Sequence, residues 1–222
     1  MSLLGFVTAI LALLMAADSQ PQSSSAENDK IQTVINRVEQ LCREETIYMI
    51  GPEKAKRLAE LVREAKPKKV VECGTAAGYS GLWIARELKA LGSGKLITIE
   101  IDPERVRQAE AHFREAGLAD YIEVKVGDAT KLVGEIEGPI DFAFIDCNAP
   151  NYLPCIEKLA PKLSPGAVVV ADNAGISAGG MKGYLEFVRS KYKSTTEWFD
   201  VDLPWAKRDA MEISVVPGKP NE

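Results

Sequence analysis

The chain has 222 residues and a mass of 24.2 kDa, with 46% apolar and 27% charged residues. This composition is typical of a globular protein and excludes a chain that is disordered throughout. No repeat with a period of about 20–50 residues is present, which excludes a solenoid. The net charge is −5 and the pI about 5.2, so we expect no nucleic-acid partner. The single histidine, His112, excludes metal sites that need two imidazoles and argues against a Ser-His-Asp triad.

An uncharged stretch, LLGFVTAILALLMAA, covers residues 3–17. As a helix it would span roughly 22 Å, short of the ~30 Å hydrocarbon core of a membrane. Three interpretations stay open: a signal peptide with a small-residue site at 17–19, a short anchor that contacts the membrane, or a hydrophobic helix that packs on the protein or on a partner chain. Residues 18–29 are polar and Ser-rich, as is typical of a linker. We therefore expect the segment 1–29 to precede one folded domain over 30–222.

In chain order, apolar spacing predicts one helix over 31–42 and a second from Gly51-Pro52 to Lys66. These two amphipathic helices could support a homodimer. Short apolar runs then alternate with helical patterns. The runs are 69–73, 96–101, 121–126, 140–145 and 167–171, and the helical segments are 80–91, 103–116, 129–136, 152–163 and 181–192.

Two further strands, 197–201 and 211–216, have no helix between them and predict an antiparallel hairpin at one edge. Apolar strands that alternate with helices indicate a parallel sheet covered on both faces. The predicted fold class is therefore α/β, with a single doubly wound, mostly parallel seven-stranded sheet.

Ligands of such sheets bind at the carboxyl ends of the strands, so the residues found there matter most. Glu72 lies near the end of the first strand, and Gly74 and Gly78 follow it in a turn. Their GxxxG spacing differs from the GxGxxG of nicotinamide-dependent dehydrogenases. Glu100 ends the second strand and can accept both hydroxyls of a ribose, while Asp128 follows the third, where an adenine amine could bind. The glycine turn alone equally suits a plain strand-to-helix turn, but the ordered set favours a nucleoside-containing ligand.

A second set of polar side chains follows the fourth and fifth strands. Asp146 comes after the fourth strand, and Asp172 and Asn173 after the fifth. Two carboxylates and an amide oxygen suit a hard divalent cation such as Mg²⁺. The alternative is that these residues only cap the helices and loops that follow them.

Several segments between Ile50 and Val216 resemble the class I S-adenosylmethionine (SAM)-dependent methyltransferases. Within that class they are similar to the small metal-dependent O-methyltransferases of the catechol and caffeoyl-coenzyme A type. The matching segments occur in the family's order and read MIGPEKAKRLAEL, VVECGTAAGYSGLWIA, LITIEIDPE, VGDA, FIDCNAPNYLP, ADNAG and DAMEISVV.

The resemblance implies a Rossmann-like methyltransferase fold, SAM as cofactor and a divalent cation, expected to be Mg²⁺. The implied cofactor-binding residues are Ile50 and Gly51 at a helix start, Glu72, Gly74, Gly78 and Ser80 around the methionine part, Glu100 at the ribose, Asp128 and Ala129 at the adenine, and Asp146 at the methionine end. The implied metal ligands, which would act catalytically through the metal, are Asp146, Asp172 and Asn173.

One position departs from the family pattern. The family's lysine, close to the hydroxyl that loses its proton, is replaced here by Ala149, and the residue before it is Asn148. Alanine can neither accept a proton nor carry a charge. Lys182 and Lys207 are candidates for a substitute base, with solvated surface lysines as the alternative. Trp205 could stack on a flat acceptor, with a packed edge residue as the alternative.

The expected function is methyl transfer from SAM to a hydroxyl of a small acceptor, an aromatic vicinal diol, assisted by a metal. The alternative is a cofactor-binding protein of the same fold with another acceptor or little turnover, which Ala149 favours. The four cysteines, Cys42, Cys73, Cys147 and Cys155, lack CxxC spacing and predict reduced, mostly buried thiols. We therefore expect a cytoplasmic domain, or one tethered to a membrane and facing the cytosol, while the segment 3–17 leaves secretion open.

Overall fold

The computed structural model describes residues 21–218. The uncharged stretch 3–17 and the small-residue site at 17–19 therefore lie outside the described residues, and the three interpretations of this segment stay predictions. Within 21–218, no helix combines the length and the apolar character needed to cross a membrane.

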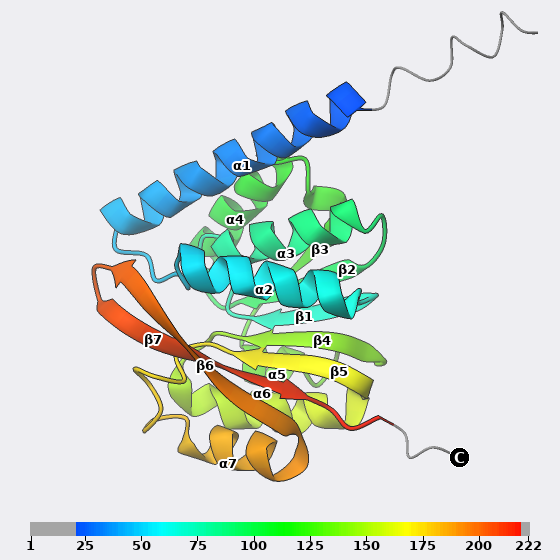
Figure 1. The fold of residues 1–222 in the computed structure, drawn as a ribbon, viewed down its shortest axis with the longest axis vertical. Coiled ribbons are helices and arrows are strands. Elements are labelled where there is room, and N and C mark those ends of the chain that lie inside the picture. The colour runs from blue at the N-terminus through cyan, green and yellow to red at the C-terminus, as the bar shows by residue number, and fades with distance from the viewer. Residues whose placement is uncertain (1–20, 219–222) are drawn as a thin grey trace, which may run out of the picture.

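In the described part of the chain, seven strands form one sheet in the order β3-β2-β1-β4-β5-β7-β6 (Figure 1). They are β1 (Lys69–Cys73), β2 (Lys95–Glu100), β3 (Ile122–Val126), β4 (Ile140–Ile145), β5 (Leu163–Ala171), β6 (Lys193–Leu203) and β7 (Ala206–Val215). The first five pair in parallel, and β7 runs antiparallel to both β5 and β6. The predicted mostly parallel sheet with an antiparallel edge hairpin is confirmed, and its switch point lies between β1 and β4.

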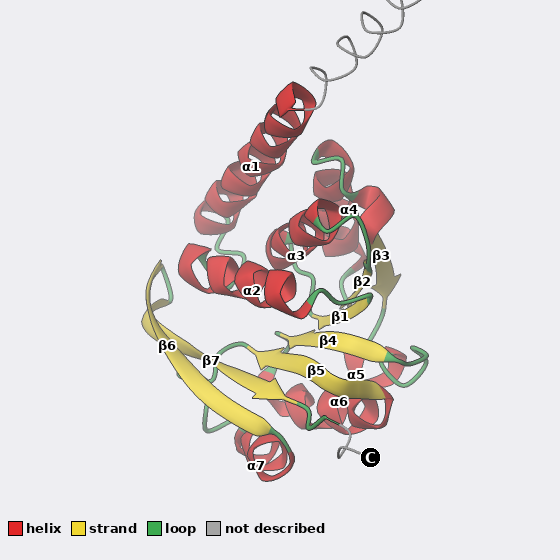
Figure 2. Cartoon of the chain, turned by 45° about the vertical axis from the view of Figure 1, so that its right-hand side comes forward, coloured by secondary structure: helices red, strands yellow, loops and turns green. Residues whose placement is uncertain are grey.

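Helices cover both faces of the sheet (Figure 2). On one face lie α2 (Pro52–Ala65), α3 (Tyr79–Ala90) and α4 (Pro103–Glu115), with α1 (Pro21–Glu44) packed across α3 and α4; on the other lie α5 (Ala129–Leu132), α6 (Tyr152–Leu159) and α7 (Lys182–Lys191). Each layer has its own apolar core. Strands buried on both faces explain why the sequence shows continuous apolar runs rather than alternation.

The N-terminal helix is longer than the sequence predicts. The linker expected over 18–29 is wrong from Pro21 onward, because α1 begins there. Ile31, Val34, Ile35 and Val38 are buried, and once this packed part is helical, each added residue extends the helix at little cost. Pairing of two copies through this region stays a prediction.

The helix after β3 is shorter than the sequence predicts, and the two strands of the edge hairpin are longer. The helix predicted over 129–136 ends at Leu132, two residues before Gly134, a poor helix former. The strands β6 and β7 are longer than the predicted 197–201 and 211–216, since their cross-strand pairing runs from Lys193 opposite Val215 to Leu203 opposite Ala206.

Candidate active site

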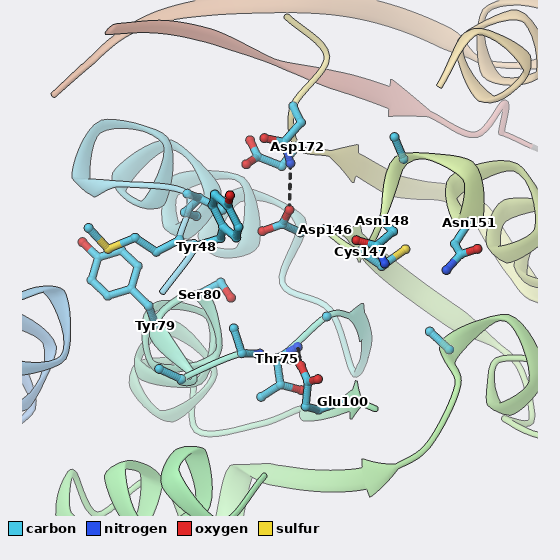
Figure 3. Close-up of a pocket in the computed structure, with 18 of the residues that line it drawn as sticks. Tyr48, Thr75, Tyr79, Ser80, Glu100, Asp146, Cys147, Asn148, Asn151 and Asp172 are labelled. Carbon is cyan, nitrogen blue, oxygen red and sulfur yellow. Dashed lines mark hydrogen bonds between the residues drawn. The ribbon is translucent and has the colours of Figure 1, made fainter. Parts of the chain in front are cut away.

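A cavity of about 580 Å³ opens at the carboxyl ends of the central strands (Figure 3). Most of the residues implied by the family resemblance line it, namely Ile50, Gly74, Ser80, Glu100, Ala129, Asp146, Asp172 and Asn173. The remaining four do not reach its wall, namely Gly51, Glu72, Gly78 and Asp128. None of the lining residues in the described part of the chain is a lysine, an arginine or a histidine.

The glycine turn after β1 brings two strand ends into close approach. Gly74 has a φ of 103°, and a Cβ added there would lie 2.1 Å from the carbonyl oxygen of Asp146. Only glycine therefore allows the turn to lie against the end of β4. Gly78, with a φ of 87°, is the N-cap of α3, and a Cβ there would lie 2.8 Å from the ring of Phe113.

Glu100 is held rigidly at the end of β2. Its Oε2 accepts hydrogen bonds from the backbone N–H groups of Thr75 (3.2 Å) and Ala76 (2.8 Å), and its Oε1 accepts from those of Ile101 (2.9 Å) and Asp102 (3.0 Å). These bonds fix the turn after β1 around the carboxylate. A ligand hydroxyl would have to share acceptor sites that these amides already use.

Glu72 lies behind the cavity wall rather than in it. The side chain is fully buried and accepts hydrogen bonds from the hydroxyls of Ser80 and Thr98, each over 2.5 Å. Burial raises the pKa of this carboxyl to about 7, against the lowering effect of its two hydroxyl partners. Ser80 lines the cavity, and so does Thr75, whose hydroxyl bonds that of Thr98. Glu72 therefore reaches the cavity directly through Ser80 and indirectly through the Thr98–Thr75 pair.

Two more predicted residues have local structural roles. Asp128 is the N-cap of α5 and accepts hydrogen bonds from the backbone N–H (2.9 Å) and the hydroxyl (2.7 Å) of Thr130. Its neighbour Ala129 does line the cavity. A Cβ on Gly51 would lie 3.3 Å from Leu203 at the tip of the β6–β7 hairpin, so this glycine lets the start of α2 approach the hairpin.

The three residues predicted to bind a cation come together beside the cavity. Asn173 has a left-handed backbone, with a φ of 59°, a conformation that asparagine tolerates better than most residues. Its Nδ2 donates to Asp146 Oδ1 (3.0 Å) and to the hydroxyl of Tyr152 (3.3 Å). The dashed line that ends on Asp146 in Figure 3 marks the first of these bonds. The amide nitrogen is therefore engaged by protein, which leaves the carbonyl oxygen as the group that can face a cation.

Asp172 has a partner that the sequence does not reveal. Lys54 of α2 is 1% exposed, and its Nζ donates to both oxygens of Asp172 (2.7 and 2.9 Å) and to Oδ2 of Asp209 on β7 (2.6 Å). The sequence does indicate that Lys54 is buried, because Lys54 precedes Leu58 by four residues and so falls on the apolar face of α2. Nothing local to β7 marks Asp209 as its partner.

The charges of this cluster favour a bound cation. When Asp146, Asp172 and Asp209 are all ionised, they outnumber the single ammonium of Lys54 by two charges, which a divalent cation would neutralise. Burial raises the pKa of Asp146 well above its usual range, and the neighbouring charge of Asp172 raises it further. Burial likewise raises the pKa of Asp172, against the lowering effect of Lys54.

The donor chemistry of the predicted set fits a hard cation. Within 21–218, no three His, Cys, Asp or Glu side chains group together as metal ligands, and the predicted set consists of two carboxylates and one amide. Such oxygen donors, in a cluster short of positive charge, suit Mg²⁺. Capping does not account for them, because Asp172 binds Lys54 and Asp146 binds Asn173.

Aromatic and apolar side chains form the mouth of the cavity. Tyr48 and Trp205 lie edge to face with their ring centroids 5.1 Å apart, and both line the cavity. Tyr48 is 72% exposed and Ile176, also on the wall, is 51% exposed. Exposed apolar groups around an opening are typical of a ligand site.

The structure does not bring either candidate lysine to the cavity. Lys182 pairs with Glu186 over 3.7 Å, Lys207 pairs with Asp202 over 2.6 Å, and both lysines are mostly exposed. Ala149 does line the cavity, at the start of the short 3₁₀ turn η2 (Ala149–Asn151). The position of the family's lysine is therefore inside the site and carries no proton acceptor.

Known proteins share this fold and part of this sequence. Residues 71–174 match the methyltransferase domain family. Catechol O-methyltransferase B of Danio rerio is 31% identical over 196 residues, which cover 84% of this chain and 73% of that protein. The structure of the O-methyltransferase TomG from Streptomyces achromogenes in complex with SAM aligns with a TM-score of 0.72 and 25% identity, covering 83% of this chain and 90% of that one.

Fold and sequence together define a methyltransferase of the Rossmann-like type. The chain belongs to the class I SAM-dependent O-methyltransferases. A catechol O-methyltransferase of Niastella koreensis is 36% identical over 128 residues, and this match spans 56% of the chain and 57% of the Niastella enzyme.

Proposed function

We propose that this protein transfers a methyl group from SAM to a hydroxyl of a small acceptor, an aromatic vicinal diol, with the help of Mg²⁺. The observation that carries the proposal is one cavity that joins Glu100 at the end of β2 to Asp146, Asp172 and Asn173 at the ends of β4 and β5. The first side chain suits a ribose, and the other three suit a hard cation that a diol can chelate.

The side chains of the cavity divide into two regions. Glu100 and the turn it holds, with Ser80, Ile50 and Ala129, would bind the cofactor, which supplies the methyl group. Tyr48 and Trp205 would hold a flat acceptor against the mouth and keep water away from it. Fixing the acceptor oxygen against the methyl carbon is the main contribution of such a site, since alignment of two reactants removes much of the barrier.

Asp146, Asp172 and Asn173 would hold the cation. These side chains would place the cation where it would lower the pKa of an acceptor hydroxyl and fix the angle of the attacking oxygen. The protein supplies no lysine, arginine or histidine in the described wall of the cavity, so the proton of the acceptor hydroxyl would pass to solvent water rather than to one of these side chains.

A second candidate rests on Ala149. If catechols need the missing lysine, the protein binds SAM but methylates another acceptor or turns over little. The alanine lines the cavity at the position concerned, and neither Lys182 nor Lys207 takes the lysine's place.

The compartment is part of the proposal. In the described chain all four cysteines are free, and three of them are buried. Free thiols and a cofactor made inside cells both suit a catalytic domain that faces the cytosol. Mature protein that begins near Gln20 in an extracytoplasmic fraction would overturn this assignment.

The deciding experiment measures SAM binding by calorimetry and methyl transfer to catechol with Mg²⁺ or with excess chelator. We expect turnover only with the metal. Asn173→Ala should abolish it, whereas Asn148→Ala, an exposed residue on the same wall, should not. Full turnover in chelator would refute the metal site, and SAM binding without any turnover of catechol would establish the second candidate.

A further inference from the structure

Asp209 binds two different parts of the site with its two oxygens. Its Oδ2 accepts from Lys54 Nζ (2.6 Å), and Lys54 in turn donates to both oxygens of Asp172. Its Oδ1 accepts from the backbone N–H groups of Gly175 (3.2 Å) and Ile176 (2.9 Å). One carboxylate on β7 thus contacts the partner of a proposed cation ligand and the loop that forms one wall of the cavity.

This arrangement is buried and closely packed. Asp209 and Lys54 are each 1% exposed, and Asp172 is 2% exposed. A Cβ added to Gly175 would lie 2.9 Å from Asp209 Oδ1 and 2.9 Å from the ring of Trp198, so the loop lies directly against β7. The three charged groups therefore have little freedom to exchange partners.

We infer that Asp209 is a positioning residue for the cation site, which acts through Lys54 by sharing the charge of the ammonium between two carboxylates. The inference rests on the cation binding proposed above. With Asp209 charged, Lys54 is attracted to both carboxylates and leaves part of the charge of Asp172 for a cation. Without that charge, Lys54 is attracted to Asp172 alone and opposes a cation there.

The chain contains a matched control on the same hairpin. Asp202 also pairs with a lysine, Lys207, over 2.6 Å, but their side chains are 89% and 80% exposed. Neutralising Asp202 removes the same charge from the same hairpin, outside the cavity. An exposed pair of this kind contributes little to stability and is screened by salt.

The test measures the binding of Mn²⁺ to the full chain, with the electron paramagnetic resonance signal of the free ion as the readout. Asp209→Asn keeps the shape of the side chain and an oxygen for the loop amides. We expect it to weaken Mn²⁺ binding by roughly tenfold or more, as is usual when a residue that supports a metal ligand is lost. Asp202→Asn should bind Mn²⁺ as the unchanged protein does, and SAM binding reports whether each variant is folded.

A double variant separates action through Lys54 from a general structural effect. Lys54→Met combined with Asp209→Asn removes the lysine that opposes the cation, so Mn²⁺ binding should recover relative to Asp209→Asn alone. This variant also carries no unpaired buried lysine, which protects the test if the single variant fails to fold.

Each result has one meaning. No Mn²⁺ binding by the unchanged protein would refute the proposed cation site and the inference with it. Unchanged binding in Asp209→Asn, or no recovery in the double variant, would refute the inference and leave the proposed function intact.

Discussion

Ser80, on the cavity wall, donates its hydroxyl to the buried carboxylate of Glu72 over 2.5 Å. The same carboxylate accepts the hydroxyl of Thr98, so a titratable group sits one side chain behind the candidate cofactor site. Burial raises its pKa from 4.5 to about 7, which makes its charge sensitive to pH in the neutral range.

Glu72→Gln should reduce the dependence of stability on pH. Because the folded-state pKa of Glu72 is raised, its stabilising contribution is complete below about pH 4.5 and is lost as the pH rises through about 7. Glutamine is neutral at every pH. The free energy of unfolding of the variant should therefore exceed that of the unchanged protein at pH 8, by on the order of 3 kcal/mol at most, and should not exceed it at pH 4.5. Urea unfolding at both pH values measures this; Glu53→Gln, an exposed residue, is the control. Equal pH dependence in the two proteins would contradict the assignment.

Glu100→Gln should weaken SAM binding. The variant loses the charge expected to bind the ribose, and one of its two terminal atoms can no longer accept a backbone N–H. Each charge-assisted hydrogen bond contributes about 1.5–3 kcal/mol, so affinity should fall roughly 10- to 100-fold in calorimetry. Glu104→Gln, on the next helix and paired with the exposed Arg107, is the control. Unchanged affinity in Glu100→Gln would remove the cofactor assignment.

Gly74→Ala should destabilise the protein and abolish SAM binding. The added Cβ would lie 2.1 Å from the carbonyl oxygen of Asp146, in a backbone conformation that side chains rarely adopt. Strain and overpacking together predict a loss of about 3 kcal/mol in the free energy of unfolding. Gly179→Ala has no atom within 4 Å of the new Cβ and should be neutral in the same thermal and urea unfolding experiments.

Ala149→Lys should raise the rate on catechols at neutral pH. The new side chain would start from the cavity wall and supply a general base, worth about 10²-fold at best. Lys182→Ala and Lys207→Ala should leave the rate of the unchanged protein as it is, since neither lysine lines the cavity. A pH–rate profile checks the first expectation. Loss of activity in either alanine variant would show that a lysine of the unmodified protein acts as the base.

Much of the fold follows from local patterns. Apolar runs between helical segments predict the parallel sheet, and the absence of a helix after residue 201 predicts the edge hairpin. The sequence does not predict the start of α1, because the residues from Pro21 to Asp29 are mostly polar and their helix depends on the packing of the turns that follow. The composition of residues 21–29 alone does not show that the packed turns after them stabilise a helix there.

In the candidate site, too, local patterns predict some residues, whereas others depend on tertiary packing. The placement of Glu100, Asp146, Asp172 and Asn173 at the cavity could be predicted because each lies at the end of a strand or just after it, and strand ends meet at one edge of the sheet. The burial of Glu72 could not, since a strand apolar on both faces does not show which neighbours its one polar side chain meets. The pairing of Lys54 with Asp209 depends on how α2 packs on the sheet, which no local pattern records.

The contact between Lys54 and Asp209 joins positions 155 residues apart. During synthesis the chain emerges from its N-terminus, so Lys54 and Asp172 are both made before the strand that carries Asp209. Until β7 arrives, β5 has an open edge and the loop at Gly175 has no carboxylate to bind it. The site is therefore completed only when nearly the whole chain has been made, and a chain that stops before Ala206 would lack the strand that closes it.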